Sequence, residues 1–399
     1  MRDWQDLNIG SICIKIIDYR GKTPEKVLSG TKLITSKVIK NSRILDNANF
    51  EYIRDDKYEE VMRRGKPEFQ DILLTTEAPL GEVALIKSDE KIAIAQRIIL
   101  LRADQDKVIP DFLFYSLRGP IGYNRVQQKG TGTTVLGIKN PELKKVILPI
   151  PPLPTQQKIA KILSNHDDLI ENNLKRIKLL EESARLIYEE WFLRFRIDGK
   201  KLEIDPESSL PFGWELVELG DFLKFKKGKK ADEIFEEKKD NLIKLLLLSG
   251  LGSGEYAYVE KARHVIARRG DVLMTMDGAR SSVVFYSEDG AVGSTMSLVE
   301  TGKLPKSYLY HFFKSTYEWL EINNTGAAIP HANKSFINKM KIIHPGDEIL
   351  TKWSKKMYHI NDQVFNLKDQ NQLLKEARDI LLPRLMTGMI DTDELDIAV

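Results

Sequence analysis

The sequence predicts an α+β protein in which two similar domains with curved β-sheets are joined by two long antiparallel helices that form a coiled-coil spacer. Three observations indicate this fold class: an internal duplication, short β-branched runs in each copy, and a long helical segment after each copy. The chain has 399 residues, of which 42% are hydrophobic and 30% are charged, as in ordinary folded domains. This length predicts two to three domains with buried cores.

The duplication is visible as short matches that keep the same order along the chain. Matched residues lie 210, then 200, then 194 positions apart, as expected when loops differ in length while the elements keep their order. The matches are residues 4–10 (WQDLNIG) with 214–220 (WELVELG), 71–75 (DILLT) with 271–275 (DVLMT), Thr131-Gly132 with Thr325-Gly326, Lys145 with Lys339, and Leu179-Leu180 with Leu373-Leu374.

The first part of each copy combines strand-like runs with short helices. β-Branched runs predict strands at residues 12–17, 72–76, 83–86 and 98–101. Two short helices are expected at 111–118 and 307–314. Because strands outnumber helices, each of these parts is expected to be an α+β domain with a curved sheet.

The second part of each copy is predicted to be a long helix. A proline-rich segment, residues 149–154 (PIPPLP), ends the first domain, Thr155 can cap the helix that follows, and no Gly or Pro interrupts that helix before Phe192. Its apolar heptad positions coincide with those of a C-terminal segment 194 residues later. The residues expected to pack are Leu163, Ile170, Ile177, Leu180, Ile187, Ile360, Val364, Leu367, Leu374 and Leu381.

Each long helix lacks a second helix in its own copy, so the two are expected to pair with each other. Polar residues in the same rows, His166, Asn173, Asn371 and Arg378, would set the register or face a further partner. In the alternative, both are ordinary amphipathic helices of a globular core. The expected boundaries are 1–152 for the first domain, 153–200 for the first helical region, 201–345 for the second domain and 346–399 for the second helical region.

Composition excludes several classes of protein. The longest apolar runs fall far below the ~20 residues of a membrane-spanning helix, and the first residues carry no signal-peptide core, so a cytoplasmic protein without membrane contact is expected. A single cysteine, Cys13, cannot form an internal disulfide or a cysteine zinc site. With 61 basic and 58 acidic residues the net charge is +3, so any nucleic-acid-binding face must concentrate the basic groups.

No catalytic or metal site is predicted. The phosphate-binding pattern G-x-x-x-x-G-K-[ST] does not occur, and residues 140–142 (NPE) differ from the Asn/Asp-Pro-Pro-aromatic tetrapeptide of amino-methyltransferases. The glycines of residues 250–254 (GLGSG) predict a flexible turn. Adjacent Asp167 and Asp168 point about 100° apart on a helix, which favours a solvated face. The six histidines show no H-x-x-x-H spacing.

Several extended patterns resemble the specificity subunits of type I restriction–modification systems. Residues 151–160 (PPLPTQQKIA), with 167–170 (DDLI) and 179–192, are similar to the central region of that family. Residues 377–388 (ARDILLPRLMTG) resemble its C-terminal region, and residues 19–24 (YRGKTP) resemble an early segment of its first recognition domain.

The resemblance implies two target-recognition domains that each read one half of a bipartite, asymmetric duplex DNA site. It implies that the paired helices act as a spacer and as the docking surface for two methyltransferase subunits, with restriction/translocase subunits joining the complex. S-adenosylmethionine would be bound by the methyltransferase partners, so this chain would be non-catalytic and hold no cofactor. One departure is visible, since the second copy has residues 344–348 (HPGDE) in place of the proline-rich entry.

Within the domains, DNA contacts are expected from exposed loops that carry Arg, Lys, Asn and Thr, with phosphate contacts favoured over base contacts. The small residues of 129–134 would let the backbone approach a phosphate closely. The candidates in the first domain are Arg20, Lys22, Lys129, Thr131, Thr133 and Thr134. The candidates in the second are Lys226, Lys227, Lys229, Lys230, Arg280, Asn323, Thr325, His331, Asn333 and Lys334. A solvated loop remains an alternative for residues 226–230.

Two other functions stay open at this point. The chain could be a fused or cryptic DNA methyltransferase or nuclease, or a coiled-coil protein scaffold that does not bind DNA.

Overall fold

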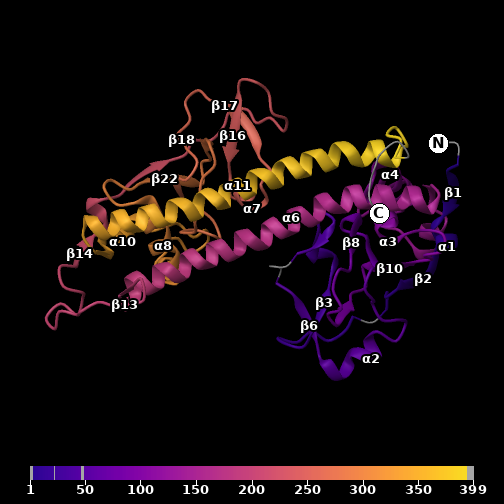
Figure 1. Cartoon of the computed structure of the whole chain (residues 1–399), viewed down its shortest axis with the longest axis horizontal. Helices are drawn as coiled ribbons and strands as arrows, with labels where there is room; N and C mark the ends of the chain where they lie inside the picture. The colour runs from indigo at the N-terminus through magenta and orange to yellow at the C-terminus, as the bar shows by residue number, and fades with distance from the viewer. Residues whose placement is uncertain (1–2, 22, 46–48, 393–399) are drawn as a thin grey trace. The chain divides into compact units, whose positions relative to one another are not determined.

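The computed structural model describes residues 3–21, 23–45 and 49–392, without the side chains of 252 and 253. The chain separates into two compact units (Figure 1). Unit 1 comprises Met1–Glu171 and Leu373–Val399, and unit 2 comprises Asn172–Gln372. Both boundaries fall inside the two long helices, so each unit contains a part of each helix.

Unit 1 is built around two sheets. Its strands are β1 (Gln5–Asn8), β2 (Cys13–Asp18), β3 (Thr31–Ile34), β4 (Ile39–Lys40), β5 (Arg43–Ile44), β6 (Glu51–Ile53), β7 (Ile72–Thr76), β8 (Leu80–Leu85), β9 (Ile92–Ile94), β10 (Ile98–Ala103) and β11 (Ile147–Ile150). The larger sheet is antiparallel, with strand order β2-β10-β7-β8. The other has order β6-β3-β9, in which β3 and β9 are parallel. The four predicted strands are confirmed, with β8 beginning earlier than expected.

Unit 2 repeats this topology. Its strands are β12 (Arg196–Ile197), β13 (Lys200–Lys201), β14 (Glu215–Glu218), β15 (Lys224–Lys227), β16 (Leu242–Leu246), β17 (Ala257–Glu260), β18 (Ile266–Ala267), β19 (Val272–Thr275), β20 (Val284–Tyr286), β21 (Gly290–Val292), β22 (Met296–Glu300) and β23 (Lys341–His344). The order β15-β22-β19-β20 matches β2-β10-β7-β8, and the parallel pair β16–β21 matches β3–β9. The pair β14–β23 likewise matches β1–β11. The predicted duplication is confirmed.

Short helices cover the sheets at equivalent positions. They are α3 (Pro110–Arg118), α4 (Pro120–Gln128) and α5 (Asn140–Lys144) in unit 1, and α8 (Lys306–Ser315), α9 (Tyr317–Ile322) and α10 (Lys334–Lys339) in unit 2. Further short helices are α1 (Ile9–Ile12), α2 (Tyr58–Val61) and α7 (Leu248–Ser253). The 3₁₀ turns are Ser36–Val38, Asp55–Lys57 and Leu219–Asp221. α3 and α8 agree with the two predicted helices.

The glycine-rich segment 250–254 corrects one expectation. It forms part of α7 instead of a flexible turn, and the helix ends at Gly254, whose φ of 78° is the left-handed conformation that glycine adopts without cost.

The long helices are α6 (Leu153–Tyr188) and α11 (Asp347–Met386). α6 begins two residues before the predicted cap, so Thr155 lies inside its first turn and the prediction that it caps the helix is wrong. Pro154 is tolerated there because the first helical N–H groups have no intrahelical partner. α6 continues into a π-helical turn, Glu189–Leu193, which carries the buried aromatic residues Trp191 and Phe192. Within the described residues, no helix is both long enough and apolar enough to cross a bilayer.

α6 and α11 lie side by side in each unit and run in opposite directions (Figure 1). In unit 1, Leu163 shares a core with Leu382 and Leu385. In unit 2, Ile177 packs with Val364. The later residues of α6 therefore face the earlier residues of α11, which confirms the predicted antiparallel pairing within each unit.

The residues expected to pack lie on the inner faces of these helices. Those that are buried are Leu163, Ile170, Ile177, Val364 and Leu367, and those that are half-buried are Leu180, Ile187, Ile360, Leu374 and Leu381. Of the polar positions, Asn173 and Asn371 are both buried, and the Asn173 amide donates to the Asn371 side-chain oxygen at 3.0 Å. An amide pair in an apolar seam favours one register, because any shift would leave both groups unpaired.

Ile177→Ala tests the energetic weight of this pairing. The substitution removes a buried side chain from the helix–helix core of unit 2, so we expect it to lower the free energy of unfolding by about 2–4 kcal/mol. Chemical denaturation followed by circular dichroism measures the loss. Leu179→Ala is the matched control, because Leu179 is 69% exposed on the same helix and should change stability by less than about 0.5 kcal/mol. Equal losses for both variants would contradict the pairing.

Candidate nucleic-acid interface

Two equivalent loops, one in each unit, contain the predicted DNA-binding residues Thr131, Thr133, Thr134, Thr325 and His331. Loop 1 (residues 131–137) and loop 2 (residues 325–331) each close on themselves through a pair of backbone hydrogen bonds. In loop 1 the Thr131 N–H donates to Gly137 O at 2.7 Å and the Gly137 N–H donates back at 3.0 Å. In loop 2 Thr325 and His331 exchange the same bonds at 2.9 and 2.7 Å.

A glycine in left-handed conformation makes each loop tight. Gly132 has φ 126° and Gly326 has φ 90°. A Cβ at Gly132 would lie 2.2 Å from Val135 O, and a Cβ at Gly326 would lie 2.3 Å from Ile329 O, so neither position accepts a side chain without moving the loop. The fixed turn presents Val135 and Ile329, which are 194 residues apart, with 52% and 58% of their surface exposed.

Beneath loop 1 lies the turn that precedes β8. Glu77 forms an isolated bridge with Gly137, and its carboxylate pairs with Arg97 at 2.7 Å. The predicted contacts Thr131, Thr133 and Thr134 in this loop, and Lys129 just before it, are all exposed. In the described part of the chain Lys129 has no ion-pair partner, so its charge is available to an anion.

Loop 2 lies on the equivalent turn of unit 2. The carboxylate of Asp277 lies 2.8 Å from the ring nitrogen Nδ1 of His331 and 3.3 Å from the ammonium of Lys227. Burial raises the pKa of Asp277, but His331 and Lys227 lower it by more, so its carboxyl is held ionised. The structure therefore brings Lys227 and His331 to one carboxylate, which partly neutralises the Lys227 ammonium.

Several of the residues predicted to bind DNA in unit 2 make contacts within the unit itself. The Asn333 side chain accepts a hydrogen bond from the Phe336 N–H at 3.0 Å and so caps α10, and the Asn323 amide donates to Trp319 O at 2.8 Å. The Arg280 guanidinium lies 5.9 Å from the ring centre of Phe285, and the Lys334 ammonium lies 5.6 Å from that of Phe225. Both cations remain exposed.

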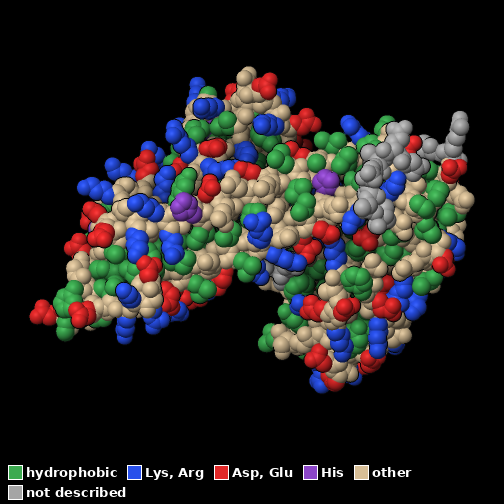
Figure 2. Space-filling model, viewed as in Figure 1, with side chains coloured by type: hydrophobic (Ala, Val, Ile, Leu, Met, Phe, Trp, Pro, Cys, Tyr) green, Lys and Arg blue, Asp and Glu red, His purple; other side chains and the backbone are tan. Residues whose placement is uncertain are grey.

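The lysines of residues 226–230 flank the end of β15. Lys226 pairs with Glu300 at 2.5 Å across the strand pair β15–β22. Lys229 and Lys230 are exposed. The Lys229 backbone bridges to Gly293, so this segment is held against the sheet and is not a freely solvated loop. Figure 2 shows basic and acidic side chains interspersed over the visible face, which agrees with the near-zero net charge.

Arg20 lies in a different place, at the end of β2. Its guanidinium makes bidentate contacts with Asp18 at 2.5–3.0 Å, and Arg64 donates to the backbone oxygens of Asp18 and Arg20. Lys22 lies outside the described residues. Around Arg20 is a hollow of about 460 Å³. Among the residues that line it, sequence reasoning missed Arg54, Arg63, Arg64 and Gln96.

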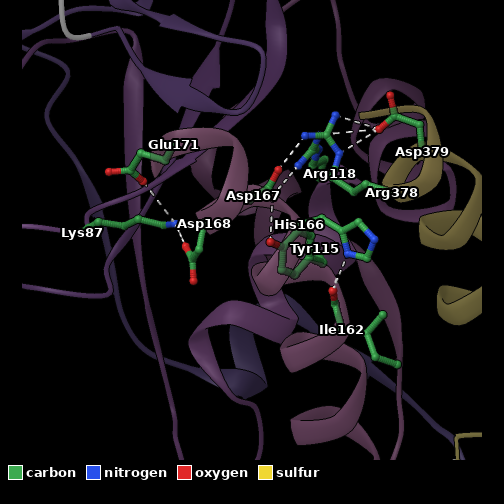
Figure 3. A network of polar contacts seen from close by, with 10 residues as sticks. All are labelled: Lys87, Tyr115, Arg118, Ile162, His166, Asp167, Asp168, Glu171, Arg378 and Asp379. Atoms are coloured by element: carbon green, nitrogen blue, oxygen red, sulfur yellow. Dashed lines mark hydrogen bonds and ion pairs between the residues drawn. The ribbon is translucent and has the colours of Figure 1, made fainter. Parts of the chain in front are cut away.

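A second polar site that sequence reasoning missed lies where α3, α6 and α11 meet (Figure 3). The carboxylate of Asp167 accepts hydrogen bonds from the Tyr115 hydroxyl at 2.7 Å, from Arg118 at 3.0 Å and from Arg378 at 2.5 Å. The prediction that Asp167 is solvated is therefore wrong, whereas the neighbouring Asp168 is exposed and contacts Lys87 at 2.7 Å. The prediction for Arg378 holds, because its guanidinium joins α11 to α6.

The charges of this network decide the ionisation of Asp167. Burial raises the pKa of its carboxyl, but Arg118 and Arg378 lower it by more, so the net pKa lies below the usual value. In unit 2 the position 194 residues after Asp167, in the register that the two long helices share, is Asn361, which carries no charge. The network is thus a feature of the first copy and not of the duplication.

The pH dependence of stability tests the Asp167 network. A carboxyl with a lowered folded-state pKa stabilises the protein above its unfolded pKa of about 3.9, and this contribution disappears as the pH falls through the folded value. Asp167→Asn should therefore lower the free energy of unfolding by about 3 kcal/mol at pH 7, and the difference from the wild type should shrink below about pH 4. Denaturation at a series of pH values measures this difference.

Asp168→Asn is the matched control, because the Asp168 carboxylate is 60% exposed and its removal should have little effect at any pH. A wild-type advantage over Asp167→Asn that is constant from pH 7 to pH 3 would contradict the assigned ion pairs.

Comparison with known proteins agrees with this architecture. The sequence model described as "Type I restriction modification DNA specificity domain" matches residues 1–182 and again 211–377. The chain is 28% identical over 349 residues to the type I restriction enzyme MjaIX specificity subunit of Methanocaldococcus jannaschii, covering 81% of this chain and 78% of that protein. It is 22% identical to the MjaVIII specificity subunit of the same organism, covering 99% and 94%.

A solved structure shows the same fold. The crystal structure of the type I restriction–modification S subunit from M. genitalium superposes with a TM-score of 0.57 at 18% identity, covering 96% of both chains. The two family matches coincide with the two copies of the sheet topology, and together they span most of the chain. The chain therefore belongs to the type I restriction–modification DNA specificity family, as a DNA sequence-recognition subunit.

Proposed function

We propose that this chain reads a bipartite, asymmetric duplex DNA site, with residues 1–152 and 201–345 as its two target-recognition domains. The observation that carries the proposal is the pair of loops 1 and 2, which close with the same pair of backbone hydrogen bonds in two units of the same sheet topology. Two equivalent readers match two half-sites, and their different side chains make the half-sites different. Residues 153–200 and 346–399 join the readers.

DNA binding is supported by the exposed cations around the loops. Lys129 in unit 1, and Lys229, Lys230, Arg280 and Lys334 in unit 2, are exposed and carry no ion pair with a carboxylate of the described residues. Such groups can neutralise phosphates, while the exposed Thr131 and Thr325 can donate to them. Lys226, Lys227 and His331 would first have to exchange their present carboxylate partners for phosphate.

Docking of two methyltransferase subunits is supported by a repeated apolar row on the outer faces of the helices. Leu179 and Leu186 on α6 are 69% and 42% exposed, and Leu373 and Ile380 on α11 are 65% and 54% exposed. Each pair has the seven-residue spacing of a coiled-coil seam, and the two pairs lie 194 residues apart. Two copies of one partner need two equivalent surfaces, which this repetition provides.

The chemical step is assigned to those partners, which would bind S-adenosylmethionine, and restriction/translocase subunits would complete the complex. The chain's own cysteine is not an activated nucleophile. Burial and the charge of Asp104 raise the pKa of the Cys13 thiol to about 12, so it is protonated at neutral pH and a poor nucleophile. The chain is then a recognition and assembly subunit without catalysis of its own.

Binding to a pool of random-sequence duplexes tests the proposed function. We expect the chain with its methyltransferase subunits to select a bipartite site, with an affinity that falls log-linearly with salt at ~0.9 per neutralised phosphate. Gel shift and sequencing of the bound fraction measure both. Methylation or cleavage by the chain alone would favour a cryptic enzyme, and no DNA binding at any salt concentration would favour a protein scaffold.

Substitutions that place a single charge in either exposed apolar row test the docking surface. A buried unpaired carboxylate is costly at an interface, so Leu186→Asp and Ile380→Asp should each reduce the stoichiometry from two methyltransferase subunits to one, and the double variant should bind none. Native mass spectrometry measures the stoichiometry. Leu169→Asp is the control, because Leu169 is a 52% exposed leucine of α6 outside the rows. Two bound subunits in either single variant would place the docking surface elsewhere.

A further inference from the structure

The two copies differ most clearly in the segment that joins two equivalent strands. In unit 1 the chain between β3 and β6 forms the short hairpin β4–β5, which carries Lys37, Lys40 and Arg43 in or beside it. In unit 2 the connection between β16 and β17, residues 247–256, contains α7 and has no Lys or Arg. The same connection is therefore a basic hairpin in the first domain. In the second domain it is a short helix whose segment contains one glutamate and no basic residue.

The hairpin is a defined structure rooted in a core. Val38 and Ile39 are buried in the cluster that also contains β3 and β6, and Ile44 packs against that cluster. At the tip, Asn41 and Ser42 have φ of 53° and 59°. Two consecutive positive φ values are those of a type I′ turn, the two-residue connection that matches the twist of a hairpin. The core thus holds the base of the ribbon while the tip projects outward.

The charges at the tip oppose the stability of the hairpin. Lys40 and Arg43 are directly opposite each other in the strand register, and both are exposed. Like charges at facing positions destabilise a strand pair. Among the residues that the structure describes, no carboxylate forms an ion pair with Lys37, Lys40 or Arg43. A like-charge pair that costs stability, with no ion pair to a carboxylate of the described residues, fits a surface that meets a polyanion.

The hairpin borders the same edge of the sheet as loop 1. β4 and β5 both pack against β8, the edge strand of the order β2-β10-β7-β8. Loop 1 lies against the turn that leads into the same strand, since Gly137 of the loop forms an isolated bridge with Glu77. The basic hairpin and the glycine loop therefore flank one strand and can contact one stretch of duplex.

We infer that the β4–β5 hairpin is the specificity-determining element of the first target-recognition domain, entering the major groove with Lys40, Asn41 and Arg43 at its tip. The groove admits a two-stranded ribbon, Arg and Lys pair with guanine edges, and Asn pairs with adenine. The backbone turn that loops 1 and 2 share cannot by itself make the two half-sites different, whereas the β4–β5 hairpin has no counterpart between β16 and β17. The inference rests on the proposed DNA-reading function.

The test compares the wild type with Lys40→Ala/Arg43→Ala in the full-length chain bound to its methyltransferase subunits. Both proteins select from a pool of random-sequence duplexes. We expect the variant to lose base preference at adjacent positions of one half-site, to discriminate there about 5- to 150-fold less, and to keep the other half-site unchanged. The melting temperature should stay equal or rise, because a like-charge pair has been removed.

Lys15→Ala is the matched control. Lys15 is an exposed lysine on β2, at the opposite edge of the same sheet, and should leave both half-sites unchanged. If the double variant selects the wild-type site with wild-type discrimination, or if its affinity falls equally for all sequences, the hairpin does not read bases and the inference is overturned. Failure of the wild type itself to select any sequence would instead refute the proposed DNA-reading function.

Discussion

The packing of α6 against α11 is the constraint on which the rest of the structure depends. In unit 1 the core of the N-terminal domain includes Leu382, Leu385 and Met386 from the far end of the chain. Fully burying three such side chains contributes on the order of 5–9 kcal/mol, as an upper estimate. Since whole domains are stable by only about 5–15 kcal/mol, the first domain depends on α11 for much of its stability. The duplication therefore does not produce two independent halves.

Polar contacts give this packing a single register. An apolar seam repeated every seven residues tolerates a shift by one heptad, but a shift would separate Asn173 from Asn371 and Asp167 from Arg378. The positions that correspond to Asn371 and Asn173 in the other copy are Ile177 and Leu367, which are apolar and share one cluster. The polar pair thus occupies only one of two related positions and makes the helix pair asymmetric.

The features that sequence reasoning found are the ones with a local or repeated signal. Heptad spacing identifies the long helices, β-branched runs identify the strands, and the Thr-Gly match identifies loops 1 and 2. The Asp167 network has no such signal, because its partners Tyr115, Arg118 and Arg378 are 52, 49 and 211 residues away. From the sequence alone, two adjacent aspartates on a helix predict a solvated face. Only the tertiary structure shows that three donors surround Asp167.

The same reasoning explains why loops 1 and 2 could be predicted from the sequence whereas the β4–β5 hairpin could not. The geometry of loops 1 and 2 depends on one glycine in each, and glycine is visible in a sequence. The hairpin occurs in one copy only, and its turn, Asn41-Ser42, lacks the glycine that usually marks a type I′ turn. Elements shared by both domains are constrained by the common fold and repeat in sequence. Elements that distinguish the domains are free to differ, so they leave no internal repeat by which to find them.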